Sequence, residues 1–187
     1  GGDPAAAKAL LEQAFAAVVN NDDRFMAGNL AISLGSATQD SAMQRRGLEA
    51  MLASGKVPLE EQGKYNVFVG QLALQARDYA AAQAAILEAK RLNHVDPEMD
   101  VILAEAYIGN NQAAQGLGVL SQAIETRRAA GQMAPEAWYR RGLGLAYKAK
   151  ALDHASVFAK ALARDYPTNE NWAGAITVVR EVGNYKD

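Results

Sequence analysis

Residues 65–89 of the chain read YNVFVGQLALQARDYAAAQAAILEA, and this stretch decides the fold. Small residues recur in it among larger ones, namely Gly70, Ala82 and Ala89 among Val69 and Ile86. Two helices can cross closely only where the side chains between them are small, and larger residues then fill the space beside the crossing. The stretch therefore predicts two helices that pack against each other across a short turn.

The same pattern returns downstream at a nearly constant interval. Gly70 and Ala104 are 34 residues apart, Ala104 and Gly142 are 38 apart, and Trp138 and Trp172 are again 34 apart. One pair of helices cannot bury its own apolar face, whereas stacked pairs can. A period of this length therefore predicts a solenoid of helix pairs, with a last, partial copy that begins at Trp172.

The recurring residues resemble the tetratricopeptide repeat family over roughly residues 61–187. The residues that carry the resemblance are Gly70, Ala82, Ile86 and Ala89 in the first copy, Leu103, Ala104, Tyr107, Leu120 and Ala123 in the second, and Trp138, Gly142, Phe158 and Ala161 in the third. The resemblance implies an all-α fold, a right-handed superhelix of antiparallel helix pairs. Arg141 and His154 depart from the family's pattern, which usually has a large apolar residue and a small one at these places.

Ten helices are predicted from periodicity and from the helix start signals. They cover about residues 4–20, 23–37, 40–54, 58–77, 79–92, 97–110, 112–130, 135–149, 151–165 and 169–182. Thr168 is the expected N-cap of the last one. The first three do not match the repeat cleanly. We therefore assign residues 1–57 to irregular or capping helices, and residues 58–187 to one continuous solenoid of about three full repeats and one truncated repeat.

Composition removes several classes of function. The chain has 19 basic and 21 acidic residues, so it lacks the basic excess that neutralises a nucleic-acid backbone, and we expect no nucleic-acid partner. It contains no apolar run of about 18 residues, so we expect no membrane span. It has no cysteine, which removes disulfides, thiolate metal sites and cysteine nucleophiles together.

The sequence also lacks a recognisable catalytic or metal-binding constellation. His94 and His154 have no second histidine at ligand spacing, and zinc usually takes several such ligands. The Gly-x-Gly pairs at Gly116 and Gly142 lie between helix-forming residues, which favours close helix contact over a phosphate loop. The serines have no elbow or triad context. We therefore predict no catalytic residues, no metal, no cofactor and no enzyme activity.

In the tetratricopeptide family, the first helix of each pair lines a concave groove that holds the ligand. The resemblance places groove positions at Lys64, Val67, Gln71, Leu74 and Gln75 in the first copy, at Glu98, Val101, Glu105 and Ile108 in the second, and at Glu136, Tyr139, Leu143, Ala146 and Tyr147 in the third. Arg140 and Arg141 form a basic pair beside the groove, either to receive an acidic ligand residue or as a solvated pair. The candidate groove residues are Gln71, Leu74, Glu105, Ile108, Tyr139, Arg140, Leu143 and Tyr147.

Aromatic and apolar groups with a few polar ones suit an extended or helical peptide. We therefore predict a scaffold that binds a peptide or protein in this groove, unless another part of the same chain fills it. The alternative is a helical accessory domain of a larger enzyme or of a polysaccharide or secretion export machine. Residues 166–172 look similar to joints in uncharacterised bacterial periplasmic repeat proteins, which favours a periplasmic or exported location.

The final copy keeps its period through Val179 and then reaches Gly183-Asn184-Tyr185, which reads as the turn before a second helix. We therefore expect the chain to be a fragment. Without that second helix, apolar side chains should stay uncovered on one face; the candidates are Ile176, Val178, Val179 and Val182. Fraying, self-association through this helix, and coverage by the N-terminal helix of a neighbour are the three outcomes that we distinguish.

Overall fold

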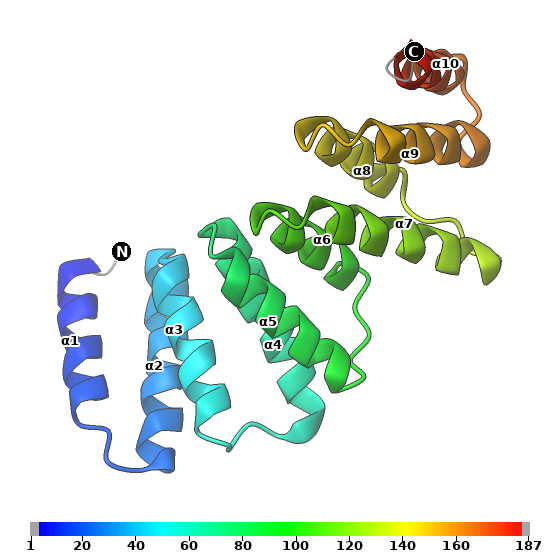
Figure 1. Cartoon of the computed structure of the whole chain (residues 1–187). Coiled ribbons are helices and arrows are strands. Elements are labelled where there is room, and N and C mark those ends of the chain that lie inside the picture. The colour runs from blue at the N-terminus through cyan, green and yellow to red at the C-terminus, as the bar shows by residue number, and fades with distance from the viewer. Residues whose placement is uncertain (1–3, 185–187) are drawn as a thin grey trace. The chain divides into compact units, whose positions relative to one another are not determined.

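The computed structural model describes residues 4–184, which form ten α-helices (Figure 1). They are α1 (Pro4–Ala16), α2 (Asn21–Thr38), α3 (Ser41–Ala53), α4 (Leu59–Gln75), α5 (Tyr79–Arg91), α6 (Met99–Gly109), α7 (Ala113–Ala129), α8 (Glu136–Lys148), α9 (Leu152–Asp165) and α10 (Asn169–Asn184). The described residues contain no strand, and neighbouring helices pack against each other, as α2 does on α3 and α8 on α9, so the predicted all-α fold is confirmed.

Four short connections of two or three residues share one turn geometry, which also ends α5 at Asn93 and α7 at Gly131 before longer connections. A residue in the left-handed region occupies each turn: Gln39 (φ 57°), Arg77 (φ 60°), Asn111 (φ 62°) and Lys150 (φ 56°). The following N–H then donates to the carbonyl five residues earlier, as from Asp78 to Ala73 at 2.9 Å. This arrangement satisfies carbonyls at the helix end and reverses the chain. The chain thus forms four helical hairpins, α2–α3, α4–α5, α6–α7 and α8–α9.

Small residues lie where the paired helices cross. A Cβ atom added to Gly70 in α4 would lie 2.7 Å from Cδ1 of Ile86 in α5, and Ala82 is fully buried. In the same way, a Cβ atom on Gly142 in α8 would overlap the ring of Phe158 in α9. The prediction that Gly70 and Ala82 are tightly packed is confirmed.

The segment before residue 58 contains a hairpin that the repeat pattern did not reveal. The helices α2 and α3 cross at Gly28 and Gly47, where a Cβ atom on Gly28 would lie 2.7 Å from the Gly47 carbonyl oxygen. Glycine on both helices allows a closer crossing than the small-against-large pattern of the later copies. The helix α1 stands outside the hairpins and packs on α2, with Leu11 in a small core beside Ala31 and Met43.

The chain divides into two compact units, Gly1–Met99 and Asp100–Asp187. One core cluster of the first unit contains Leu48, Val69 and Ala85, and the core of the second unit contains buried residues of α6 to α10. The predicted boundary after residue 57 and the predicted continuity of residues 58–187 stay predictions about the repeats.

The helix α10 begins as predicted and ends later than predicted. The Thr168 hydroxyl accepts a hydrogen bond from the Asn171 N–H at 3.1 Å, which confirms Thr168 as the N-cap. The helix then continues through Gly183 to Asn184, so the predicted turn there is wrong, and Tyr185 lies outside the described residues. None of the helices between residues 4 and 184 is long and apolar enough to cross a membrane.

Candidate functional site

A hollow of about 470 Å³ opens on the first unit between α3 and α4. Its lining combines apolar, amide and charged side chains, namely Ile32, Gln44, Leu48, Glu61, Lys64, Tyr65, Phe68, Gln71, Leu72 and Gln75. The volume falls within the range of about 300–1,000 Å³ that is usual for ligand sites. We refer to it as the α3–α4 hollow.

One face of α4 supplies most of the ligand-accessible side chains of the α3–α4 hollow. Lys64, Phe68, Gln71 and Gln75 are spaced at four, three and four residues, so they follow one another along the same side of the helix. Phe68 is 42 % exposed, and the Lys64 Nζ lies 5.9 Å from the centre of its ring. The hollow therefore offers an aromatic surface with a positive charge at one edge.

The wall behind this face is held by the core. Tyr65 and Leu72 pack against the buried cluster of Leu48, Val69 and Ala85. Side chains fixed in this way keep the hollow in one shape, so a ligand would find it largely preformed.

Amide groups supply the polar part of the α3–α4 hollow. The Gln44 Nε2 donates to the Gly35 carbonyl at 3.0 Å, which fixes that side chain on α3. Gln71 and Gln75 make no side-chain hydrogen bond within residues 4–184. Each amide presents a donor and an acceptor, so the pair can bond to the N–H and C=O groups of an incoming peptide backbone.

A second hollow of about 460 Å³ adjoins the first along α3 and shares Leu72 and Gln75 with it. Its charged residue Arg45 donates to Asp78 at 2.7 Å and to Glu49 at 2.7 Å. The Arg45 hydrogen bond, helped by the Ala81 N–H, holds the pKa of Asp78 below its usual value. The neighbouring Arg46 is paired with Glu12. These cations already have carboxylate partners, so their charge is balanced within the protein.

The structure brings together some of the predicted groove residues of the first copy, but not all of them. Gln71 lines the α3–α4 hollow together with Lys64 and Gln75, whereas Leu74 is half-buried and outside it. Val67, also given as a groove position, is 3 % exposed and belongs to the core. Phe68 was missed, because the family positions pass from Val67 to Gln71. Its spacing from Lys64 and Gln71 was the signal that could have revealed it.

The predicted groove residues of the second unit are mostly engaged with neighbouring helices. Tyr139 is fully buried, so it is inaccessible to a groove ligand and its assignment to the groove is corrected, as is that of Ala146. Ile108 and Leu143 are half-buried against the same core. The physical reason is that α9 and the segment after it cover this side of α8: the Tyr166 ring meets the Tyr139 ring edge-on at 5.7 Å.

The polar members of this group form pairs across helices. The Glu105 carboxylate accepts from the Arg141 Nε at 2.7 Å, and Arg140 donates to Glu136 and, at 3.2 Å, to Asn171. The Tyr147 hydroxyl donates to Glu181 at 2.8 Å. These contacts link α6 to α8 and α8 to α10. In the second unit, the polar side chains that were predicted to bind a ligand therefore bond to neighbouring helices.

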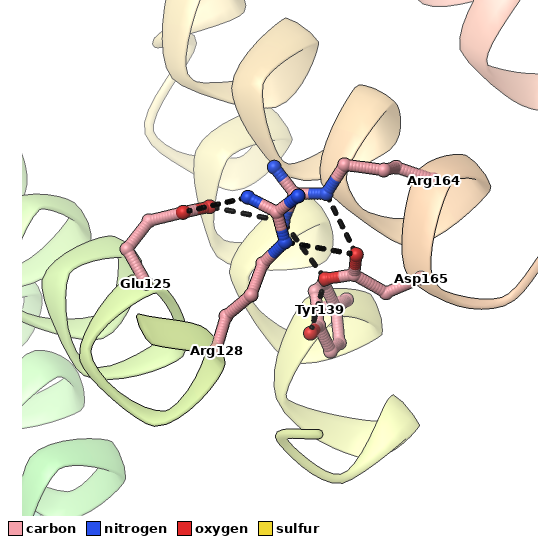
Figure 2. A network of polar contacts seen from close by, with 5 residues as sticks. All are labelled: Glu125, Arg128, Tyr139, Arg164 and Asp165. Carbon is pink, nitrogen blue, oxygen red and sulfur yellow. Dashed lines mark hydrogen bonds and ion pairs between the residues drawn. The ribbon is translucent and has the colours of Figure 1, made fainter. Parts of the chain in front are cut away.

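Figure 2 shows a polar network in the second unit that sequence reasoning did not find. Asp165, at the end of α9, accepts hydrogen bonds from the Tyr139 hydroxyl at 2.8 Å and from the Arg164 Nε at 2.6 Å. Arg164 also donates to Glu125 of α7 at 3.0 Å, and the Arg128 Nε lies 3.6 Å from Asp165. The network thus joins α7, α8 and α9.

The electrostatics of this network are those of a structural ion cluster. The Arg164 hydrogen bond is the main cause that holds the pKa of Asp165 below its usual value. Burial raises the pKa of Tyr139, and the hydrogen bond to Asp165 raises it further. A carboxylate kept ionised between two arginines is not a proton donor or acceptor near neutral pH. No spacing rule links residues 139 and 165, which is why the pair was not foreseen.

No group of three or more acidic or histidine side chains within residues 4–184 is placed to hold a metal ion. His94 packs over Gly63, where an added Cβ atom would collide with the His94 side chain, so it serves helix packing. Comparison with known proteins gave no match to a family model, to a curated protein or to a solved structure.

Proposed function

We propose that this protein is a binding module that holds an extended or helical peptide segment of another protein in the α3–α4 hollow. The observation that carries the proposal is the α4 face, where the exposed Phe68 ring stands beside the uncommitted amides of Gln71 and Gln75. An aromatic ring supplies contact area for an apolar ligand side chain, and the amides supply hydrogen bonds for its backbone.

The charges of the hollow narrow the ligand further. Lys64 and Glu61 lie on the same side of α4, three residues apart, so the hollow has no net charge of its own. A peptide with one apolar anchor and flanking polar residues matches this lining better than a polyanion or a purely apolar ligand.

We also infer that the hairpins belong to a tetratricopeptide-like, right-handed superhelix. The inference is supported by the shared turn geometry of the four hairpins and by the crossings at Gly70 and Gly142. Small-angle X-ray scattering of the full chain tests it. The scattering curve should fit a curved solenoid of stacked hairpins, and a curve that fits two independently tumbling bodies would contradict it.

A selection experiment tests the binding proposal. A phage-displayed library of random linear peptides is panned against the immobilised full chain, and the enriched peptides are synthesised with a fluorescent label. Their affinity is then measured by fluorescence anisotropy for the wild type and for Phe68→Ala and Gln71→Ala.

Leu87→Ala is the matched control, because Leu87 is also 42 % exposed but lies on α5 outside the hollow. We expect Phe68→Ala to weaken binding by at least about tenfold, as is usual for a central aromatic anchor. Leu87→Ala should leave the affinity unchanged. Enrichment of no peptide, or of peptides that bind Phe68→Ala as tightly as the wild type, would overturn the proposal.

A further inference from the structure

The helix α10 carries an apolar stripe that the described part of its own unit leaves uncovered. Trp172 is 53 % exposed, Ile176 51 % and Val179 40 %, and all three lie on one side of the helix. The adjacent side holds Ala175 and Val178, which are buried in the core of the second unit. The apolar surface of α10 is therefore wider than the part that its own unit covers. The uncovered face that was expected from the sequence is confirmed for Ile176 and Val179.

Gly183 extends the stripe by one further turn. It is exposed, and a Cβ atom added to it would meet nothing within 4 Å. The stripe thus consists of Trp172, Ile176, Val179 and Gly183, with spacings of four, three and four residues. This is the spacing of a seam between two helices in a coiled coil.

The spacing reads the same in both directions along the helix. If a second α10 is laid antiparallel on the first, the largest residue, Trp172, falls opposite the smallest, Gly183, while Ile176 falls opposite Val179. A large side chain against a glycine and two medium ones against each other fill the seam evenly. A surface that is complementary to its own reversed copy is what a two-fold contact between identical chains requires.

We propose that this stripe docks a second copy of the chain, α10 lying antiparallel on α10 with Trp172 of each copy over Gly183 of the other. The proposal is independent of peptide binding in the α3–α4 hollow, which lies in the other unit.

The flanks of the stripe favour the same occupant. Ala173 and Arg180 follow one edge of it, and in the antiparallel pair Arg180 of one copy faces Ala173 of the other, so like charges do not oppose each other. The other edge is formed by Ala175 and Val182, which are apolar. A charged partner would find no complementary charge within the stripe, whereas a second copy needs none.

Three apolar side chains from each copy form a small interface. It falls at the low end of the sizes of specific contacts, below about 1,200 Å². We therefore expect a reversible dimer with a dissociation constant on the order of 10–100 µM.

Sedimentation equilibrium over concentrations from about 10 µM to about 1 mM tests for the dimer. Ile176→Glu should raise the dissociation constant at least about tenfold, because it places a carboxylate in the centre of the seam. Val157→Glu is the matched control: Val157 is 49 % exposed but lies on α9. Circular dichroism checks that both variants keep their helices. A chain that stays monomeric throughout, or a dimer that Ile176→Glu leaves intact, would overturn the proposal.

Two substitutions of Ala173 test the antiparallel direction. Ala173→Glu places a carboxylate opposite Arg180 of the other copy and should tighten the dimer roughly threefold, while Ala173→Arg should weaken it by a similar factor. In a parallel pair, position 173 does not face position 180, so the sign of the charge would have no such effect. A dimer that responds to Ile176→Glu and is indifferent to both Ala173 variants overturns the antiparallel docking.

Fluorescence gives an independent readout. Trp138 is buried in the core, so concentration-dependent changes in acrylamide quenching report on Trp172. Quenching should fall as the dimer forms, and this fall should be absent in Trp172→Phe. Quenching of the wild type that does not change across the dimerisation range would place the contact elsewhere on the molecule.

Discussion

The hydroxyl of Tyr139 donates a 2.8 Å hydrogen bond to the carboxylate of Asp165, and this bond fastens the middle of the second unit. The tyrosine comes from α8 and the carboxylate from the end of α9, 26 positions later in the chain (Figure 2). Tyr139 is fully buried and the Asp165 side chain is 8 % exposed, so the bond is shielded from water. A shielded bond to an ionised acceptor is among the stronger hydrogen bonds in proteins.

Tyr139→Phe should therefore destabilise the protein. The substitution removes the hydroxyl that donates to the nearly buried Asp165 carboxylate. We therefore expect the free energy of unfolding, measured by urea denaturation, to fall by about 1–3 kcal/mol. Tyr147→Phe is the matched control, because the Tyr147 hydroxyl donates to Glu181 at the same 2.8 Å but at an exposed site. Equal losses in the two variants would show that shielding from water does not matter here.

Acid should weaken the second unit through Asp165. Its pKa is lowered in the folded protein, chiefly by the hydrogen bond from Arg164. A carboxyl group with a depressed folded pKa stabilises the protein above its unfolded pKa, near 3.9, and this contribution is lost as the pH falls through the folded pKa. The melting temperature of the wild type should thus exceed that of Asp165→Asn at pH 7, and the difference should shrink below about pH 4. A difference that does not depend on pH would mean that the ionisation of Asp165 contributes nothing.

Two glycines in α8 should respond in opposite directions to the same substitution. A Cβ atom on Gly142 would overlap the Phe158 ring, whereas one on Gly144 would meet nothing within 4 Å. Gly142→Ala should cost about 1–3 kcal/mol through overpacking. Gly144→Ala should stabilise the protein by about 0.5–1 kcal/mol, because alanine in a helix loses less backbone entropy than glycine. Thermal melts of the two single variants provide the measurement, and a shift of the same sign in both would contradict the crossing at Gly142.

The sequence predicted the helices and three of the hairpins because their crossings repeat one spacing of small and large residues. It did not reveal the hairpin α2–α3, since Gly28 and Gly47 put small residues on both helices and break the pattern. It assigned Tyr139 to a groove because a position along one helix does not show which later segment covers it, and here Tyr166 does so. Phe68 was missed for the opposite reason. The groove positions on α4 were taken from the family pattern and not from the spacing of residues along one face of the helix. On that face, Phe68 lies beside Lys64.

The crossing of α4 and α5 gives the last prediction. Ala82 is fully buried, and its carbonyl oxygen lies 3.6 Å from where a Cβ atom on Gly70 would stand, so the two helices have no spare room at this level. Ala82→Leu adds three carbon atoms there and should force the helices apart, at a cost of about 1–3 kcal/mol. Ala84→Leu adds the same atoms at an exposed position of α5 and should be nearly neutral. Thermal melts followed by circular dichroism measure both variants. A melting temperature that Ala82→Leu leaves unchanged would show that position 82 does not lie between the helices.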